Sequence, residues 1–250
     1  MSQDRVAIYW ETKQYYAGQP YIPLFPPVKY TFDAGSPVKS SASKSIVKIW
    51  PLDTIDCALH LKYNEGLNPV VLNMANAYTP GGGVEGGALA QEESIFRRSN
   101  YHLHLTRNVY PIRPNELIYS SKVHISRNSD WSYMRTPGYL DFIASAAINN
   151  PRLTPSGEYT DEDRVLMRNK IDHIFQVAYE LNHNTLLLGA FGCGAFRNPP
   201  HLVADLFAQV IQKYNGYFKR IDFAILPFVY GKTDTPDNFD IFTERLSSFT

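Results

Sequence analysis

Two adjacent glutamates, Glu92 and Glu93, follow a run of three glycines, Gly81 to Gly83, in the segment GGGVEGGALAQEESIFRR. Consecutive glycines let the backbone approach a ligand closely and adopt positive φ values. The glutamates fall at the expected start of a helix, where unpaired N–H groups and positive potential suit an anion such as a diphosphate. Because carboxylates repel phosphate, the combination indicates acid–base chemistry beside a bound anion rather than anion capture alone.

Both features also have ordinary structural explanations. Glycine clusters form plain turns, and glutamates favour the first turn of a helix because of its dipole. Side chains of neighbouring helical residues point about 100° apart, so we expect one carboxylate to face the glycine loop and the other to face away. One glutamate would then act on a substrate, while the other would fix the substrate or support the site.

A second glycine-rich turn, Gly192-Cys193-Gly194-Ala195, follows the apolar segment TLLLGAF, and Pro199 or Pro200 is expected to open the next helix. Ligands of open α/β sheets bind beyond the carboxyl ends of the strands, and two such loops could hold a diphosphate from both sides. Phe196 either stacks on a ribose or base, or is an ordinary buried aromatic. Cys193 has no basic neighbour in sequence to lower its pKa, so we expect a turn residue and not a nucleophile.

Apolar runs and amphipathic stretches alternate from residue 46 onward. Segments that are apolar throughout are typical of strands covered on both faces, and apolar residues three or four apart indicate helices. We predict strands at 69–75, 117–126, 139–147, 185–191 and 220–228, and helices within 88–101, 161–182, 201–214 and 239–249. Val165, Ile171, Ile174, Phe175 and Ala178 are expected on the buried face of the second helix. This alternation predicts a three-layer α/β architecture.

The first 45 residues differ from the rest of the chain. YIPLFPPVKY combines prolines with aromatics, and GSPVKSSASKS is small and polar. An extended segment that covers the core is favoured over a proline-rich ligand motif. We therefore predict an N-terminal extension at 1–45, partly loop-like and packed on or linked to the main body, and a main domain at 46–250.

Composition argues against several kinds of partner. The 250 residues carry 24 Lys and Arg against 24 Asp and Glu, so no net charge attracts nucleic acid or a membrane. No apolar run approaches the roughly 20 residues of a transmembrane helix, and MSQDRVAIYW lacks the apolar core of a signal peptide. Cys57 and Cys193 are too few for a disulfide framework. We expect an intracellular protein, cytoplasmic or nuclear, with no membrane or specific nucleic-acid partner.

The sequence does not match other known cofactor-binding or metal-binding motifs. Neither glycine cluster gives the GxGxxG dinucleotide fingerprint. Gly231-Lys232-Thr233 resembles the end of a P-loop, but Leu226 occupies the position of its first glycine, so a surface turn is expected. His102 and His104 are two residues apart in a helical stretch and therefore lie on different faces. We expect neither a cofactor nor a metal.

With both loops considered, the sequence resembles the macrodomain fold, and specifically the microbial-type poly(ADP-ribose) glycohydrolases. The signature of that family is three glycines, six to eight residues and Gln-Glu-Glu; here Gly81–Gly83 and Gln91-Glu92-Glu93 are separated by seven residues. LNMANAYTPGGG, EESIFRRSN, LIYSSKV and GAFGCGAFRNPP also resemble family segments, so the resemblance covers roughly residues 46–250. Tyr119-Ser120-Ser121 departs from it, because the family often has Tyr-Ser-Pro there.

The resemblance implies an α/β/α macrodomain with a mixed central sheet and an enzyme that cleaves the ribose–ribose bond of poly(ADP-ribose) to release ADP-ribose. It implies that Glu93 is the general acid and base and that Glu92 anchors a hydroxyl of the leaving ribose. It places the terminal ribose on the asparagines and Phe196, the diphosphate on the two loops, and the adenine near Phe228. The implied substrate-binding residues are Asn73, Asn76, Gly81, Gly82, Gly83, Val84, Gln91, Gly192, Cys193, Gly194, Ala195, Phe196 and Phe228.

The implied partners are ADP-ribose, poly(ADP-ribose) and ADP-ribosylated proteins, and we expect a monomer. Two alternatives stay open: a hydrolase that removes single ADP-ribose units from protein side chains, and a macrodomain that binds ADP-ribose without cleaving it. The intact Gln-Glu-Glu triplet argues against the second, since binding alone needs no acid beside a diphosphate.

Overall fold

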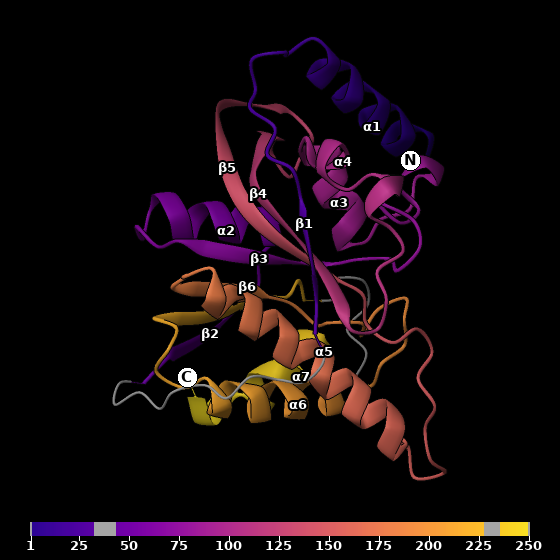
Figure 1. Ribbon diagram of the computed structural model, residues 1–250, viewed down its shortest axis with the longest axis vertical. Coiled ribbons are helices and arrows are strands. Elements are labelled where there is room, and N and C mark those ends of the chain that lie inside the picture. The colour runs from indigo at the N-terminus through magenta and orange to yellow at the C-terminus, as the bar shows by residue number, and fades with distance from the viewer. Residues whose placement is uncertain (1, 33–43, 228–235, 250) are drawn as a thin grey trace. The chain divides into compact units, whose positions relative to one another are not determined.

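The computed structural model describes residues 2–32, 44–227 and 236–249 (Figure 1). Two compact units divide the chain: the first comprises Met1–Thr31 and Asn73–Ala146, and the second Phe32–Leu72 and Ala147–Thr250. No helix within the described residues combines the length and the apolar composition that a membrane crossing needs.

The first unit combines antiparallel strands with short helices. Its elements are α1 (Ser2–Ala17), β1 (Val28–Thr31), the 3-10 turn η1 (Val84–Gly86), α3 (Gln91–Arg98), α4 (Tyr101–His104), the 3-10 turn η2 (Arg107–Val109), β4 (Glu116–Arg127) and β5 (Tyr133–Ser145). Strands β4 and β5 form a long hairpin, and β1 pairs with β4 from Val28 opposite Tyr119 to Thr31 opposite Glu116.

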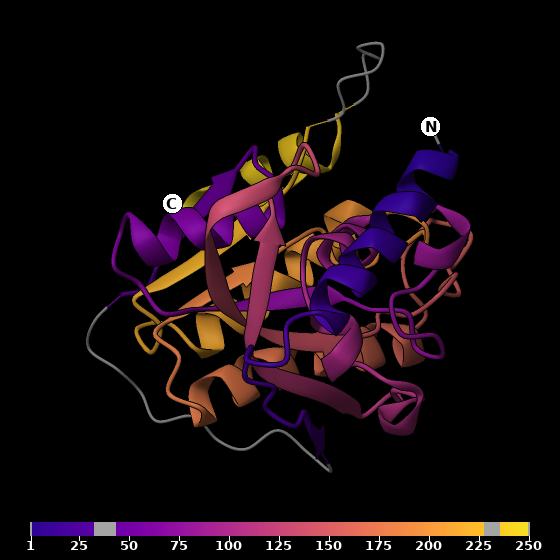
Figure 2. The same ribbon diagram turned by 90° about the horizontal axis from the view of Figure 1, so that it is seen from above.

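Helix α1 lies against α3 and the turn that precedes it (Figures 1 and 2). Tyr9, Thr12 and Tyr16 are its buried positions. The Thr12 hydroxyl donates to the backbone oxygen of Arg97 at 2.7 Å, and the Tyr16 hydroxyl donates to the backbone oxygen of His124 at 2.8 Å. These contacts couple the N-terminal helix to the segment that carries the glutamates. The boundary expected at residue 45, between an N-terminal extension and the main domain, stays a prediction.

The second unit contains parallel strands and longer helices. Its elements are β2 (Ile46–Trp50), α2 (Thr54–Tyr63), β3 (Pro69–Met74, whose last two residues belong to the first unit), α5 (Asp161–Glu180), β6 (Thr185–Leu188), α6 (Pro200–Lys213), β7 (Arg220–Ala224), α7 (Asn238–Arg245) and the 3-10 turn η3 (Ser247–Phe249). Strand β6 pairs in parallel with β3 and β7, and β7 pairs in parallel with β2. Helices α5, α6 and α7 pack side by side (Figure 1).

The predicted α/β class with mixed strand directions is confirmed, because parallel and antiparallel pairings both occur. All five predicted strands exist, and the apolar runs at 70–72 and 186–188 are buried as expected, whereas Leu226, predicted in the last strand, lies beyond the end of β7 and is 64% exposed. Helix α6 begins at Pro200, directly after Pro199. Elements α1, α2, β1 and β2 were not predicted from the sequence.

The prediction for one residue of the buried face of α5 is wrong. Val165 is 51% exposed, whereas Ile171, Ile174, Phe175 and Ala178 are all buried. At about 100° per residue, Val165 lies on the opposite side of the helix from Ile174, so the five residues cannot share one face.

Candidate active site

The loop between β3 and α3 is fastened at both ends. The side-chain oxygen of Gln91, the first residue of α3, accepts a hydrogen bond from the backbone N–H of Met74 at 2.9 Å. The side-chain oxygen of Asn76 accepts from the N–H groups of Tyr78 and Thr79, at 2.9 and 3.0 Å, and so starts a tight turn. Gln91, expected to contact substrate, therefore ties the helix to the end of the strand.

Glu92 is buried at 4% exposure and is held by three donors. Its Oε2 accepts from the N–H of Asn76 at 2.8 Å. Its Oε1 accepts from the N–H of Gly81 at 3.2 Å and from Nδ2 of Asn73 at 3.4 Å. Strand end, loop and glycine turn therefore all fix this one carboxyl group.

Glu93 is also buried, at 7% exposure, and two N–H groups hold its carboxylate. Oε1 accepts from the N–H of Gly83 at 2.9 Å, and Oε2 accepts from the N–H of Ala90 at 3.0 Å. The second bond satisfies a donor at the helix N-terminus, as the acidic residue of a capping box does. Glu93 therefore joins the glycine turn to the start of α3.

The expectation that only one glutamate faces the glycine loop is wrong. Gly81 donates to Glu92 and Gly83 donates to Glu93, so both carboxyl groups meet the same turn. The loop curves over the N-terminus of α3, and the long glutamate side chains reach two N–H groups two residues apart on it. The two carboxyl groups are therefore neighbours on one side of the site.

The three glycines are required by their surroundings. Gly81 and Gly82 have positive φ values of 75° and 58°. A Cβ on Gly81 would lie 2.6 Å from the ring of Phe96, and a Cβ on Gly82 would lie 2.6 Å from Oε1 of Glu93 and 3.1 Å from Oε2 of Glu92. Any side chain at Gly82 would occupy space that the carboxyl groups need.

The backbone N–H groups of this turn are already donated inside the protein. Besides the two bonds to the glutamates, Gly82 donates to the oxygen of Thr79 and Val84 donates to the oxygen of Gly81, at 3.0 and 3.1 Å. The hydrogen bonds of the turn therefore serve mainly to orient the two carboxyl groups. The part in substrate binding expected of Gly81 to Val84 stays a prediction.

Burial raises the pKa of Glu92 to about 8; the charge of Glu93 adds to the rise, and the hydrogen bonds from Asn76, Asn73 and Gly81 oppose it. Further polar atoms are buried without a hydrogen-bond partner within the described residues, among them Asn73 Oδ1 and the hydroxyls of Tyr101 and Tyr110. Burial and the charge of Glu92 raise the pKa of both tyrosines. Glu92 thus lies in dry, polar surroundings that favour its neutral form.

Arg97 holds the glycine turn in place through hydrogen bonds, a role that the sequence did not reveal. Its Nη2 donates to the backbone oxygen of Val84 at 3.2 Å, and its Nε donates to the backbone oxygen of Arg5 at 2.9 Å. Because the residue is fully buried, this guanidinium rigidly couples the turn to α1. No pattern in the sequence indicated this role.

In the second unit, Asn198 shapes the other glycine loop. Its Nδ2 donates to the backbone oxygens of Ile148 and Gly192, at 2.7 and 3.1 Å, and its Oδ1 accepts from the hydroxyl of Tyr159 at 2.8 Å. Gly192 has a φ of 75°, and a Cβ there would lie 2.6 Å from the Asn198 amide. The role of Asn198 was not predicted from the sequence, although it is a polar residue directly before the Pro-Pro helix start.

Other predicted site residues have varied surroundings. Phe196 is half-buried, and Gly194 and Ala195 are exposed. Burial raises the pKa of the Cys193 thiol, which agrees with a turn residue and not a nucleophile. Phe228 and the Gly231-Lys232-Thr233 turn lie outside the described residues.

Of the two histidines expected on different faces of a helical stretch, His104 is fully buried and His102 is half-buried. Within the part of the chain that the structure describes, no group of three or more His, Cys, Asp or Glu side chains is arranged to hold a metal.

The raised pKa of Glu92 predicts an unusual dependence of stability on pH. Its ordinary value is 4.5, so between about pH 5 and about pH 8 the folded protein holds a proton that the unfolded chain has released. Rising pH should therefore lower the free energy of unfolding of the wild type relative to that of Glu92→Gln. One unit of pKa corresponds to about 1.4 kcal/mol, so the difference should reach on the order of a few kcal/mol. Urea unfolding of both proteins across this range measures it, and parallel curves would contradict the assignment.

The chain was compared with known proteins. No curated protein sequence matches it. Its structure is similar to that of poly(ADP-ribose) glycohydrolase from Thermomonospora curvata, with a TM-score of 0.80 and 24% identity over 97% of this chain and 99% of that chain, which shows a shared fold. It is also similar to poly(ADP-ribose) glycohydrolase from Deinococcus radiodurans in complex with ADP-ribose, with a TM-score of 0.72 and 27% identity over 84% and 87% of the two chains.

The sequence pattern of the family described as "Microbial-type PARG, catalytic domain" matches residues 3–128, half of the chain. That range contains all of α1 but its first residue, the glycine turn and both glutamates. The chain therefore belongs to the microbial-type poly(ADP-ribose) glycohydrolase (PARG) catalytic-domain family.

Proposed function

We propose that this protein hydrolyses the O-glycosidic bond between two riboses of poly(ADP-ribose) and releases ADP-ribose. The observation that carries the proposal is the pair of buried carboxyl groups held by one glycine turn, with Glu92 biased toward its neutral form. Family membership and the similarity to an enzyme solved with ADP-ribose support it. A protein that only binds ADP-ribose would gain nothing from two buried acids beside a diphosphate.

The family resemblance, and not the geometry, makes Glu93 the proton donor and Glu92 an anchor. Ordinary two-carboxylate glycosidases place their acids on opposite sides of the bond, about 5 to 10 Å apart. Here both groups share one turn, so they do not flank a bond. In its protonated form, Glu93 gives its proton to the departing ribose oxygen while the bond to the anomeric carbon breaks. It then takes a proton from the water that attacks that carbon.

Glu92 fits the part of an anchor. Three donors fix its position, and in its neutral form it donates a hydrogen bond to a ribose oxygen or accepts one from a hydroxyl. The ribose contact expected of Asn73 stays a prediction; its side chain is fully buried, and its Nδ2 donates to Glu92. The diphosphate contacts expected of Gly192 to Phe196 stay predictions.

A hydrolase that removes single ADP-ribose units from protein side chains needs the same acid pair. Incubation with poly(ADP-ribose) and, separately, with a mono-ADP-ribosylated protein distinguishes the two activities by the release of free ADP-ribose. We expect release from the polymer. Release from the mono-modified protein alone would establish the alternative, and no release from either would overturn the proposal.

Removing the acid should slow turnover strongly while the protein still binds ADP-ribose. Glu93→Gln keeps the side-chain length, and loss of a general acid costs about 10²- to 10⁴-fold in rate, so kcat on poly(ADP-ribose) should fall by that factor. ADP-ribose binding, measured by calorimetry, should persist. The matched control is Glu158→Gln, at an exposed glutamate of the second unit. A Glu93→Gln enzyme with more than about a tenth of wild-type kcat would exclude Glu93 as the acid.

Gly82→Ala should damage catalysis by displacing the carboxyl groups. The new methyl group would lie 2.6 Å from Oε1 of Glu93, so that side chain must move, and the φ of 58° adds backbone strain. We expect kcat to fall at least about tenfold, since small displacements of catalytic groups are costly. Gly18→Ala, which meets only ordinary contacts at 3.5 Å or more, is the control. Equal activity of the two variants would contradict the packing argument.

A further inference from the structure

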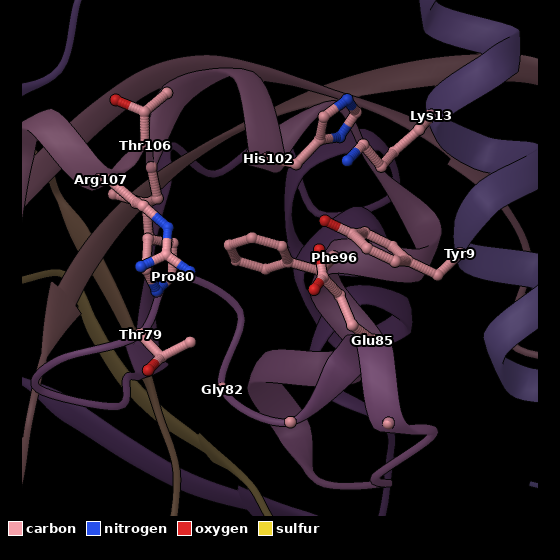
Figure 3. A pocket seen from close by; sticks show the side chains of 13 residues that line it. Tyr9, Lys13, Thr79, Pro80, Gly82, Glu85, Phe96, His102, Thr106 and Arg107 are labelled. Atoms are coloured by element: carbon pink, nitrogen blue, oxygen red, sulfur yellow. The ribbon is translucent and has the colours of Figure 1, made fainter.

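The first unit contains a pocket of about 260 Å³ on the glycine turn (Figure 3). Gly82 and Gly83 form part of its wall, and helix α1 contributes Tyr9 and Lys13. In Figure 3, Arg107 lies across the pocket from Tyr9 and Lys13, and the ring of Phe96 projects between them. None of the substrate contacts expected from the sequence, apart from these glycines, belongs to this pocket.

The pocket adjoins the proposed proton donor through the glycine turn. Gly83 lines the pocket and donates its N–H to Oε1 of Glu93 at 2.9 Å. Gly82 also lines it, and its missing Cβ position is 2.6 Å from the same oxygen. The pocket and the carboxyl group of Glu93 are therefore both in contact with Gly82 and Gly83.

The charges in the wall favour an anion. Lys13 and Arg107 are cationic, and neither forms an ion pair with a described residue. The Lys13 ammonium lies 4.4 Å from the ring centroid of Trp10 and 5.5 Å from that of Tyr9, which keeps it near the pocket. Glu85 is the carboxylate of the wall, and burial lowers the pKa of His102 to about 4, so His102 is neutral near pH 7. The wall of the pocket therefore carries two cationic side chains and one carboxylate, which favours an anionic ligand.

The size of the pocket indicates a fragment of a nucleotide. Sites for whole drug-sized ligands measure about 300 to 1,000 Å³, so 260 Å³ suits a sugar with its phosphates and not an entire ADP-ribose unit. Tyr9 and Phe96 offer aromatic walls for the sugar, while the two cations would meet the phosphates.

We propose that this pocket binds the sugar diphosphate of the polymer unit that leaves when the ribose–ribose bond is cut. The inference rests on the proposed function, because in poly(ADP-ribose) the ribose that is released carries its own diphosphate a few bonds from the cleaved oxygen. Free ADP-ribose has no such second diphosphate. The pocket would therefore bind the polymer and contribute nothing to the affinity for the product.

The test is the double variant Lys13→Gln, Arg107→Gln. Loss of ground-state binding raises KM and leaves kcat unchanged. We expect KM for poly(ADP-ribose) to rise about tenfold, kcat to stay within about twofold, and Kd for free ADP-ribose to stay at its wild-type value. The dependence of kcat/KM on salt should also become shallower, because fewer cations meet the polyanion.

Arg135→Gln is the matched control, since Arg135 is exposed on β5 of the same unit and outside the pocket. Should the double variant unfold, the single variant at exposed Arg107 carries the test. Wild-type KM in the double variant would overturn the inference while the proposed function stands. A parallel loss of ADP-ribose affinity would also overturn it, by assigning the pocket to the terminal unit. A wild-type protein inert on poly(ADP-ribose) would instead remove the proposed function, and this inference with it.

Discussion

The site depends on one glycine turn that donates N–H groups to two adjacent acids. Gly81 and Gly83 bind Glu92 and Glu93, and Gly82 leaves the space between them empty. Two carboxyl groups side by side in a dry site repel each other and lose hydration, which costs several kcal/mol unless donors replace the water. The turn supplies part of that replacement, and protonation of Glu92 supplies the rest.

This constraint explains why the surrounding elements are tied together. Gln91 fastens α3 to the end of β3, and Arg97 fastens the turn to α1. Each link limits the movement of a carboxyl group by fixing backbone at either side of it. A displacement of about an ångström reduces catalysis strongly, so a rigid frame is what acid–base chemistry at this position needs. The N-terminal helix thus belongs to the support of the site.

The sequence predicted the strands and helices whose periodicity is strong, and the glycine turn beside the two glutamates. It missed α1, because the buried positions of that helix are Tyr9, Thr12 and Tyr16, which give a weak hydrophobic pattern. It also misjudged the direction of Glu92 and Glu93, since helix geometry alone says nothing about a loop that curves over the helix end. Asn198 and Arg97 act through buried hydrogen bonds to distant backbone, and no local spacing reports such bonds.

The protonation state of the acid pair is the most direct test of the account. Carbon-13 NMR of the glutamate side-chain carboxyl groups, followed through a pH titration of the folded wild type, resolves each group. We predict one glutamate that titrates near pH 8 and whose signal is absent from Glu92→Gln. Titration of every glutamate below about pH 5, within the ordinary range of exposed carboxyl groups, would contradict the claim that the turn holds two neighbouring acids in dry surroundings.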